Sequence, residues 1–330
     1  MLRPLRSSAP GSGFVLATAG VARTVVAMAH EPIVYFHRYR RALENEKIPG
    51  EFWLRWLYSS SVTGQLALHL LARRAFFSAW YGRKMDQPKS ARRVLPFIVE
   101  HELDVEEFAK SALAYKTFND FFYRKLKDSA RPIHADPASA ILPADGRHLV
   151  FPDVDAADGF YVKGERFTVE ELLGGSLVAR QFAGGSMVIS RLAPVDYHRF
   201  HFPCAGQAGR WSETAGALFS VNPIALRRNI GYLVKNKRMT TVLTSPLFGA
   251  VALIEIGATF AGGIRQTHVP GSKVTKGEEK GLFKFGGSCV ITLFQANRIR
   301  FDSDLVAQSR DGIETYARMG DRLGLATGAA

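Results

Sequence analysis

The hydrophobic and polar positions of the chain change character about a third of the way along it. From 64 to 82, the polar residues Gln65, His69 and Arg73 recur at every fourth position among apolar side chains. This period predicts a helix with a wide apolar face, and such a face either packs on the body of the protein or enters lipid. Further helical patterns are predicted over 91–101, 105–110 and 118–127, with a linker over 83–90.

Beyond Pro132 the pattern becomes short apolar runs separated by Gly, Pro and Asp. The clearest runs cover 187–190, 242–243, 251–256 and 290–294. Runs of this length are typical of an antiparallel, β-rich domain, which a short helix over 168–173 is expected to interrupt. We therefore predict an α+β fold, in which 1–133 form a mostly helical region and 134–330 a β-rich domain.

The charge of the chain is concentrated in the predicted helical region. The net charge is +13, and the first 93 residues hold 15 Lys and Arg against 5 Asp and Glu, together with many Trp, Tyr and Phe residues. Basic and aromatic side chains together suit an anionic membrane surface. Nucleic acid is the less favoured partner, because no nucleic-acid-binding motif accompanies the basic residues.

No segment is predicted to cross a membrane. The apolar stretch over 14–29 contains Arg23, and the one over 62–81 carries Gln65, His69, Arg73 and Arg74. The region is expected to lie on a membrane without spanning it. Residues 1–30 carry three arginines and no acid, which is typical of either a targeting segment or an unstructured basic terminus.

Candidate chemistry begins with Gly287-Ser288, which directly precedes the apolar run over 290–294. The chain has five Gly-Ser pairs, and a Gly-Gly-Ser sequence is usually a turn, so Ser288 needs partners elsewhere. Asp145 lies in Pro-Ala-Asp-Gly, a common turn sequence, and His198 and His201 lie three apart between apolar residues. An acid, a histidine and a serine are the residue types of a base-activated nucleophile, although a structural role for each stays open.

Two other kinds of site are disfavoured. His198 and His201 have no further His, Cys or carboxylate at a zinc-binding spacing, so no metal is expected, and the two cysteines provide no disulfide framework. The Gly-x-Ser-x-Gly sequence of α/β-hydrolases is absent around Ser288.

Seven segments, taken in order, resemble the phosphatidylserine decarboxylase family over about 94–321. They are Phe118–Ile133, Pro143–Gly146, Val162–Gly164, Asp196–Pro203, Leu218–Pro223, Gly257–Thr259 and Lys276–Glu278. The processing motif of that family is Leu-Gly-Ser-Thr or a variant of it. Here Gly286 replaces the Leu and Cys289 the Thr, while the Gly287-Ser288 pair is kept.

The resemblance implies roles for the candidate residues. Asp145 would orient His201, and His201 would be the base that activates Ser288 to attack the carbonyl of Gly287. The chain would then cut itself between Gly287 and Ser288, and Ser288 would become a covalent pyruvoyl group that forms a Schiff base with the substrate amine. His198 would serve the decarboxylation step.

The resemblance also implies the setting of the reaction. Phosphatidylserine would lose CO2 to give phosphatidylethanolamine at the surface of a bacterial inner membrane or, alternatively, a mitochondrial inner membrane. The two self-cleavage fragments would stay together as a heterodimer that pairs again as a homodimer, with a core like the glucose-permease IIA type. The alternatives are a lipid-binding paralogue that does not process itself and a decarboxylase of the same fold with another amine substrate.

Overall fold

The computed structural model describes residues 32–48, 50–72, 75–155, 167–175, 177–258, 263–286 and 288–328. From Val34 onward the chain forms one compact unit. The segment over 1–30 and Gly287, the residue before the expected cut, lie outside the described residues.

A large sheet forms the core of this unit, and two small sheets pack against it. In the described residues the large sheet has 11 strands in the order β12-β7-β9-β10-β14-β5-β4-β16-β1-β2, with β8 paired to β9. Its strands are β1 Val34–His37, β2 Ala42–Asn45, β4 Gly146–Phe151, β5 Ser186–Leu192, β7 Gly206–Ala208, β8 Ser212–Thr214, β9 Arg238–Ser245, β10 Gly249–Gly257, β12 Lys273–Val274, β14 Ser288–Phe294 and β16 Glu314–Ala317. The small sheets are β11-β13-β6, with β6 Arg199–His201, β11 Ile264–Gln266 and β13 Glu279–Phe283, and β15-β17-β3, with β3 Ser139–Ile141, β15 Ile299–Phe301 and β17 Arg322–Ala326.

The predicted α+β class with a β-rich core is confirmed. The four apolar runs fall within β5, β9, β10 and β14, which are neighbours in the large sheet and pair antiparallel. The helix predicted over 168–173 is also present, as α7 Val169–Leu172.

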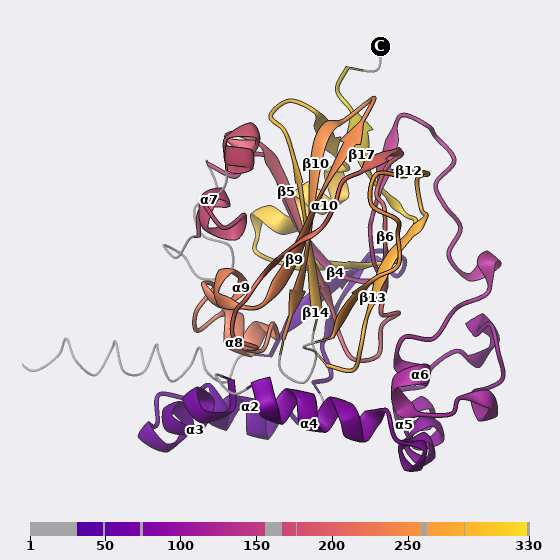
Figure 1. The fold of residues 1–330 in the computed structure, drawn as a ribbon, viewed down its shortest axis with the longest axis vertical. Coiled ribbons are helices and arrows are strands. Elements are labelled where there is room, and N and C mark those ends of the chain that lie inside the picture. Colours follow the sequence, from indigo (N-terminus) through magenta and orange to yellow (C-terminus); the bar gives the residue numbers. More distant parts are fainter. Residues whose placement is uncertain are drawn as a thin grey trace, which may run out of the picture. The chain divides into compact units, whose positions relative to one another are not determined.

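Side-chain alternation along β14 gives the sheet two different faces. Ile291 packs under α7, α8 Pro223–Leu226 and α9 Tyr232–Lys235, which cover one face of the sheet (Figure 1). Val290 points to the other face, where it packs with Phe200 of β6 and Phe283 of β13. Ser288, two residues before Val290, therefore faces the small sheet that contains β6 and β13.

The helices before the core are α2 Glu51–Leu57, α3 Val62–Ala72, α4 Ala75–Met85, α5 Val94–Glu100 and α6 Phe118–Phe122, and α10 Ser303–Arg310 lies near the C-terminus. Short 3-10 helices cover Pro88–Arg93, Val105–Glu107, Ala112–Ala114, Asp128–Ala130 and Leu177–Phe182. Figure 1 shows α2, α3 and α4 in a row along one end of the unit. The helix predicted over 64–82 corresponds to α3 and α4, and the predicted linker is shorter than expected because α4 continues to Met85.

The helix predicted over 118–127 is too long. Thr117 caps α6 by accepting a hydrogen bond from the Asp120 N–H, but α6 ends at Phe122. The following residues pair with 107–109 instead, through a bridge between Phe108 and Leu126. The same pairing limits the helix predicted over 105–110 to one 3-10 turn, because backbone groups committed to a bridge are not free for a helix.

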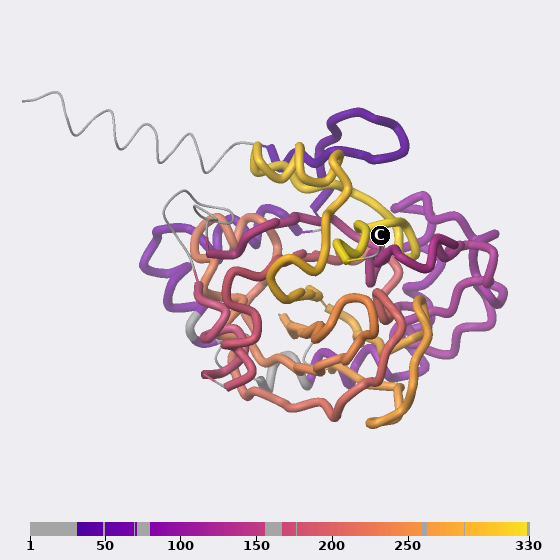
Figure 2. The backbone as a smooth tube through the Cα atoms, turned by 90° about the horizontal axis from the view of Figure 1, so that it is seen from above, coloured from indigo at the N-terminus to yellow at the C-terminus, as the bar shows by residue number. Residues whose placement is uncertain are grey.

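The hairpin formed by β1 and β2 is not predicted by the sequence pattern. β1 joins the large sheet by pairing parallel with β16. Figure 2 shows this indigo hairpin beside the yellow C-terminal part of the chain. The N-terminal region thus contributes strands to the core sheet as well as helices.

Candidate active site

Ser288 is the first residue of β14, at the centre of the large sheet. It pairs with Leu192 of β5 on one side and with Gly257 of β10 on the other. Its side chain is fully buried, and within the described residues its hydroxyl oxygen has no hydrogen-bond partner. A buried hydroxyl normally finds a partner, so an orphaned one is a candidate for chemistry.

The other serine of a Gly-Gly-Ser sequence in the described residues contrasts with Ser288. Ser186 begins β5, at the opposite end of the same ladder, where it pairs with Phe294. Its hydroxyl donates a hydrogen bond of 2.7 Å to the carbonyl oxygen of Pro152. Ser186 is thus structurally engaged, and Ser176 lies outside the described residues.

His201 ends β6, in the small sheet that Ser288 faces. Its Nδ1 lies 2.9 Å from the carbonyl oxygen of Gly277, which can only accept, so Nδ1 carries the proton. Nε2 is then the basic atom, and it accepts a long hydrogen bond of 3.3 Å from the hydroxyl of Tyr197. Burial lowers the pKa of His201, which is therefore a neutral base at pH 7.

His198 lies three residues earlier, in the turn before β6. Its Nδ1 donates to the carbonyl oxygen of Asp196 at 2.8 Å, and its Nε2 is buried with no partner in the described part of the chain. Its ring packs on Phe122 of α6, with 3.8 Å between the ring centroids. Burial, with a smaller effect from the nearby charge of Arg124, lowers the pKa of His198 to about 3.

Asp145 directly precedes β4 and is almost fully buried. Arg131 donates to both of its carboxylate oxygens, at 2.6 to 2.9 Å, and the Met319 N–H donates to one of them at 2.9 Å. Glycine is required at the next position, because a Cβ on Gly146 would lie 2.4 Å from the carbonyl oxygen of Arg191. Burial alone would lower the pKa of Arg131, but Asp145 and Glu107 raise it, so the guanidinium stays charged.

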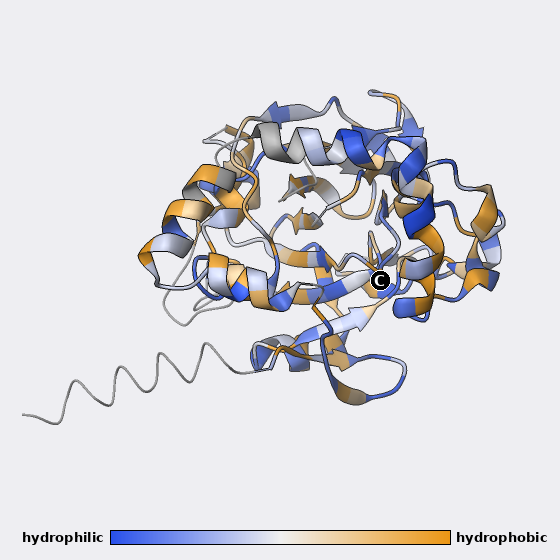
Figure 3. Cartoon of the chain, turned by 90° about the horizontal axis from the view of Figure 1, so that it is seen from below, coloured by the Kyte–Doolittle hydropathy of each residue, from blue (hydrophilic) through white to orange (hydrophobic). Residues whose placement is uncertain are grey.

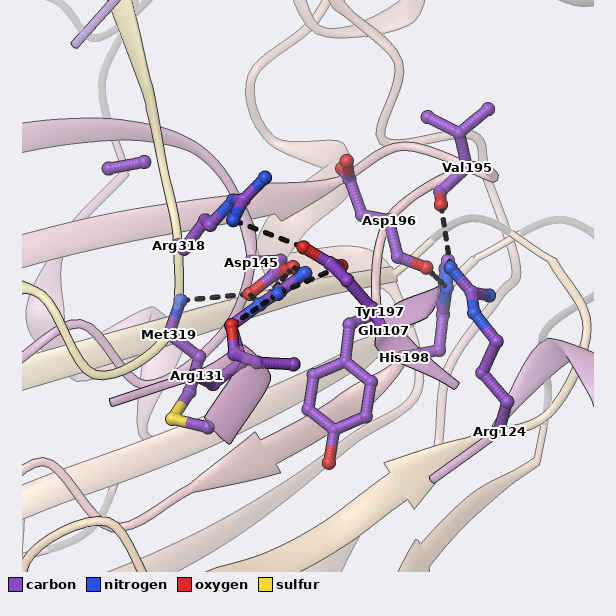
Figure 4. A network of polar contacts seen from close by, with 12 residues as sticks. Glu107, Arg124, Arg131, Asp145, Val195, Asp196, Tyr197, His198, Arg318 and Met319 are labelled. Atoms are coloured by element: carbon purple, nitrogen blue, oxygen red, sulfur yellow. Dashed lines mark hydrogen bonds and ion pairs between the residues drawn. The ribbon is translucent and has the colours of Figure 1, made fainter. Parts of the chain in front are cut away.

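Asp145 and His201 share no hydrogen bond among the described residues. The Asp145 carboxylate is occupied by Arg131 and Met319, as Figure 4 shows, and the His201 ring is oriented by Gly277. The two residues still interact through charge, because Asp145 partly offsets the effect of burial on the pKa of His201. The backbone also brings them together, since the His201 N–H donates to the carbonyl oxygen of Pro143 at 2.8 Å.

Arg124 is a site residue to which the sequence assigned no role. Its guanidinium donates to the carbonyl oxygen of Val195 at 3.1 Å, three residues before His198 in the chain (Figure 4). It lies over the rings of Phe108 and Phe121, and two of its three nitrogens have no partner in the described residues. Arg124 and Arg131 both belong to Phe118–Ile133, the first of the segments that resemble the family. That resemblance was the only indication in the sequence that they belong to the site, because neither follows a helix or strand period.

The segment before Ser288 is held by the helices. The Phe285 ring packs against Tyr81, Phe118 and Phe122, with centroid distances between 5.0 and 5.6 Å. Gly286 has φ 138°, a value that residues with a side chain rarely adopt. Glycine in place of the leucine of the family motif is therefore consistent with the local backbone.

The arrangement provides an orphaned serine hydroxyl and two buried neutral histidines on the same side of the large sheet. It can support proton transfer and nucleophilic attack by Ser288. Within the described ranges, no group of three or more His, Cys, Asp or Glu is placed to hold a metal ion.

Comparisons with known proteins identify one family. The sequence pattern of the phosphatidylserine decarboxylase family matches residues 118–325. A phosphatidylserine decarboxylase proenzyme of Fusobacterium nucleatum is 41% identical over 297 residues, which cover 90% of this chain and 99% of that protein. A protein with the same name in Chlamydia trachomatis is 42% identical, over 90% of this chain and 98% of that protein. Another in Clostridium novyi is 41% identical, over 88% of this chain and 99% of that protein.

Proposed function

The chain belongs to the phosphatidylserine decarboxylase family, and on that premise we propose that it converts phosphatidylserine to phosphatidylethanolamine and CO2. The relatives are named proenzymes, which supports self-processing between Gly287 and Ser288. The observation that carries the proposal is the hydroxyl of Ser288, buried without a partner at the first position of β14.

Self-cleavage begins with the hydroxyl of Ser288. Its oxygen attacks the carbonyl carbon of Gly287 while its proton passes to Nε2 of His201, which requires the long contact with Tyr197 to open. The peptide C–N bond breaks, the nitrogen takes up a proton, and an ester joins Gly287 to the Ser288 oxygen. Loss of the Ser288 α-proton then expels the Gly287 carboxylate, and hydrolysis of the resulting dehydroalanine releases ammonia and leaves a ketone.

Asp145 supports this step through its charge. A negative carboxylate near His201 stabilises the imidazolium that forms when the ring takes the serine proton. Arg131 and Met319 hold Asp145 in place, while Gly277 fixes the ring of His201 so that Nε2 is the proton acceptor. Orientation and charge stabilisation are thus supplied by different groups.

The pyruvoyl group made from Ser288 would supply a carbonyl that bonds the substrate amine and accepts the electron pair left by CO2. The buried position of Ser288 fits this group, because water is kept from it. We assign proton transfer at the substrate carbon to His198, whose Nδ1 is fixed by Asp196 and whose Nε2 has no partner among the described residues.

The lipid substrate is expected to arrive at the row of helices α2, α3 and α4. Phe52 and Trp53 of α2 are 75% and 68% exposed, and Val62, Leu66 and Leu70 form an exposed apolar stripe along α3. Figure 3 views these helices from below and shows hydrophobic residues among hydrophilic ones. From these exposed apolar side chains we propose that the protein binds the membrane surface peripherally. Within the described ranges, no helix is long and apolar enough to cross a bilayer.

Basic side chains accompany the apolar ones at this end of the unit. Arg83 and Lys84 lie in the last turn of α4, and the Lys84 ammonium is 3.7 Å from the centroid of the Trp80 ring. Arg92 and Arg93 end the following 3-10 helix. This composition fits an anionic lipid surface, whereas the homodimer, the IIA-type core and the domain division at 133/134 stay predictions.

The intact mass of the purified protein tests the proposal. We expect two pieces, Met1–Gly287 and Ser288–Ala330, with the smaller one lacking a free amino group at its start. Ser288→Ala should give one uncut chain, whereas Ser186→Ala should leave cleavage unchanged, because Ser186 only donates to Pro152. An active wild type that stays in one piece would refute the mechanism.

Release of CO2 from defined substrates separates the alternatives. The cut protein should release CO2 from phosphatidylserine in vesicles and much less from soluble serine or another soluble amine. CO2 release from the soluble amine alone would indicate a decarboxylase with a different substrate. An uncut chain that binds phosphatidylserine vesicles without releasing CO2 would indicate a lipid-binding paralogue.

A further inference from the structure

The side chain of Asn119 connects the helices to the segment that precedes the cut. Its Oδ1 accepts from the Phe285 N–H at 2.8 Å, and its Nδ2 donates to Asp86 Oδ1 at 2.8 Å and to the Gly82 carbonyl at 3.3 Å. Asn119 is fully buried in α6. A buried amide with both ends satisfied fixes its partners tightly, because breaking any of these bonds leaves a buried polar group unpaired.

Asp86 extends this connection to the next residue of the same segment. Its second carboxylate oxygen accepts from Lys284 Nζ at 3.2 Å. Together with the packing of the Phe285 ring on α4 and α6, these contacts hold residues 284 and 285 from the backbone and from the side chains. The chain therefore leaves Phe285 in a fixed direction, two residues before the scissile bond.

The chain is thus anchored at Phe285 and at Ser288. Ser288 is fixed by its ladder partners Leu192 and Gly257, and Phe285 by Asn119, so only Gly286 and Gly287 lie between the two anchors. Attack by a hydroxyl on the preceding carbonyl needs close approach at a particular angle, and small errors of placement cost large factors in rate.

We propose that Asn119 is a positioning residue for self-cleavage, which holds the acyl side of the Gly287–Ser288 bond in place for attack. The inference rests on the proposed cut at this bond. Asn119 contacts the segment that ends at Gly287, whereas the ketone needed for decarboxylation belongs to the new end at 288. Asn119 therefore contributes to the rate of cutting and little to turnover by the cut enzyme.

An exchange of amide and carboxylate tests the contact itself. In Asn119→Asp, one oxygen still accepts from Phe285, but the other faces the Asp86 carboxylate, and like charges repel. Adding Asp86→Asn restores a donor to that position. We expect Asn119→Asp to slow cleavage of newly synthesised chain about tenfold or more, the double variant to recover most of that loss, and Asp86→Asn alone to have a smaller effect.

The readout follows full-length chain and fragments over time in cell-free synthesis, and then measures CO2 release per pyruvoyl group in the cut fraction. Turnover per pyruvoyl group should stay within about twofold of wild type. Leu305→Ala is the control for lost stability, because Leu305 is fully buried in α10 on a different part of the core and its truncation leaves a cavity.

Any of four results would overturn the proposal. The first two are cleavage of Asn119→Asp at the wild-type rate and no recovery of cleavage in the double variant. The third is a loss of turnover per pyruvoyl group in Asn119→Asp that is as large as its slowing of cleavage. The fourth is a slowing of cleavage by Leu305→Ala as large as that by Asn119→Asp. Wild-type chain that is cut elsewhere, or a Ser288→Ala chain that is still cut, would instead contradict the proposed function and leave these variants without a reaction to report on.

Discussion

Single residues show how burial sets the protonation state of the histidines. His148 of β4 is fully buried, accepts from the Ser190 hydroxyl and donates to the Ala317 carbonyl. Burial lowers its pKa to about 4, as it lowers that of His198 to about 3. Both rings are neutral in the folded protein at pH 7, and protonation requires a positive charge in the core.

Acid should therefore destabilise the fold before the carboxylates titrate. The unfolded chain protonates these histidines near pH 6.5, so their contribution to stability is fully present above that pH and is lost as pH falls toward 4. We expect each of the two histidines to lower the free energy of unfolding by about 2 kcal/mol between pH 7 and pH 5. Urea unfolding of the Ser288→Ala chain at both pH values measures this loss of stability. His148→Gln should reduce the difference between the free energies of unfolding at pH 7 and pH 5, whatever its effect on stability at pH 7.

The two site histidines should separate by which step they affect. His201→Ala should leave the chain uncut, because His201 is the base that we propose for the proton of Ser288. His198→Ala should still be cut but should release CO2 at least a hundredfold more slowly, which is a typical effect of removing a general acid or base. Fragment analysis and CO2 release decide this, and an uncut His198→Ala chain beside a normally cut His201→Ala chain would reverse the two roles.

At the scale of elements, the hydrophobic pattern predicted four central strands because it is local. β5, β9, β10 and β14 each contain a predicted run of apolar residues, and the short helix predicted over 168–173 is α7. The end of α6 did not follow, because it depends on pairing with residues 107–109, which no local pattern encodes. The same limit applied to Arg131 and Gly277, whose contacts with Asp145 and His201 join distant segments.

The residue after β2 illustrates such a distant contact. Glu46 accepts from both terminal nitrogens of Arg191, at 2.7 and 3.0 Å, and Arg191 also pairs with Glu314 of β16. Burial would raise the pKa of Glu46, but Arg191 and Arg147 lower it. This buried group of charges ties the N-terminal hairpin to β5, the strand that pairs with Ser288.

Glu46→Gln should therefore destabilise the protein by about 3 kcal/mol, because the buried guanidinium of Arg191 then lacks one of its two negative partners. Glu44→Gln is the matched control on the same hairpin, because its ion-pair partner Arg40 is exposed and the Gln amide oxygen can still accept from the Tyr35 hydroxyl. It should cost less than about 1 kcal/mol. Denaturant unfolding of both variants in the Ser288→Ala chain compares them. Equal costs would show that the Glu46 contacts contribute no more than a surface ion pair.

At the scale of the whole molecule, the exposed apolar residues of α2 and α3 should decide where the enzyme works. Phe52→Ser with Trp53→Ser should weaken binding to phosphatidylserine vesicles about tenfold or more, because two large apolar side chains no longer enter the interface. Leu177→Ser changes an equally exposed residue in another part of the chain and should leave binding unchanged. Vesicle sedimentation measures this, and equal losses would argue against a specific surface.

The central position of β14 has a consequence for how the molecule folds. The uncut chain folds as a single molecule, but a cut before Ser288 gives β14, β15, α10, β16 and β17 to a separate chain whose first strand lies between β10 and β5. The pieces then hold together through the ladders, yet reassembly after unfolding needs two molecules to meet. The midpoint of denaturation becomes dependent on concentration, and the order of events is fixed: the protein must fold before it is cut.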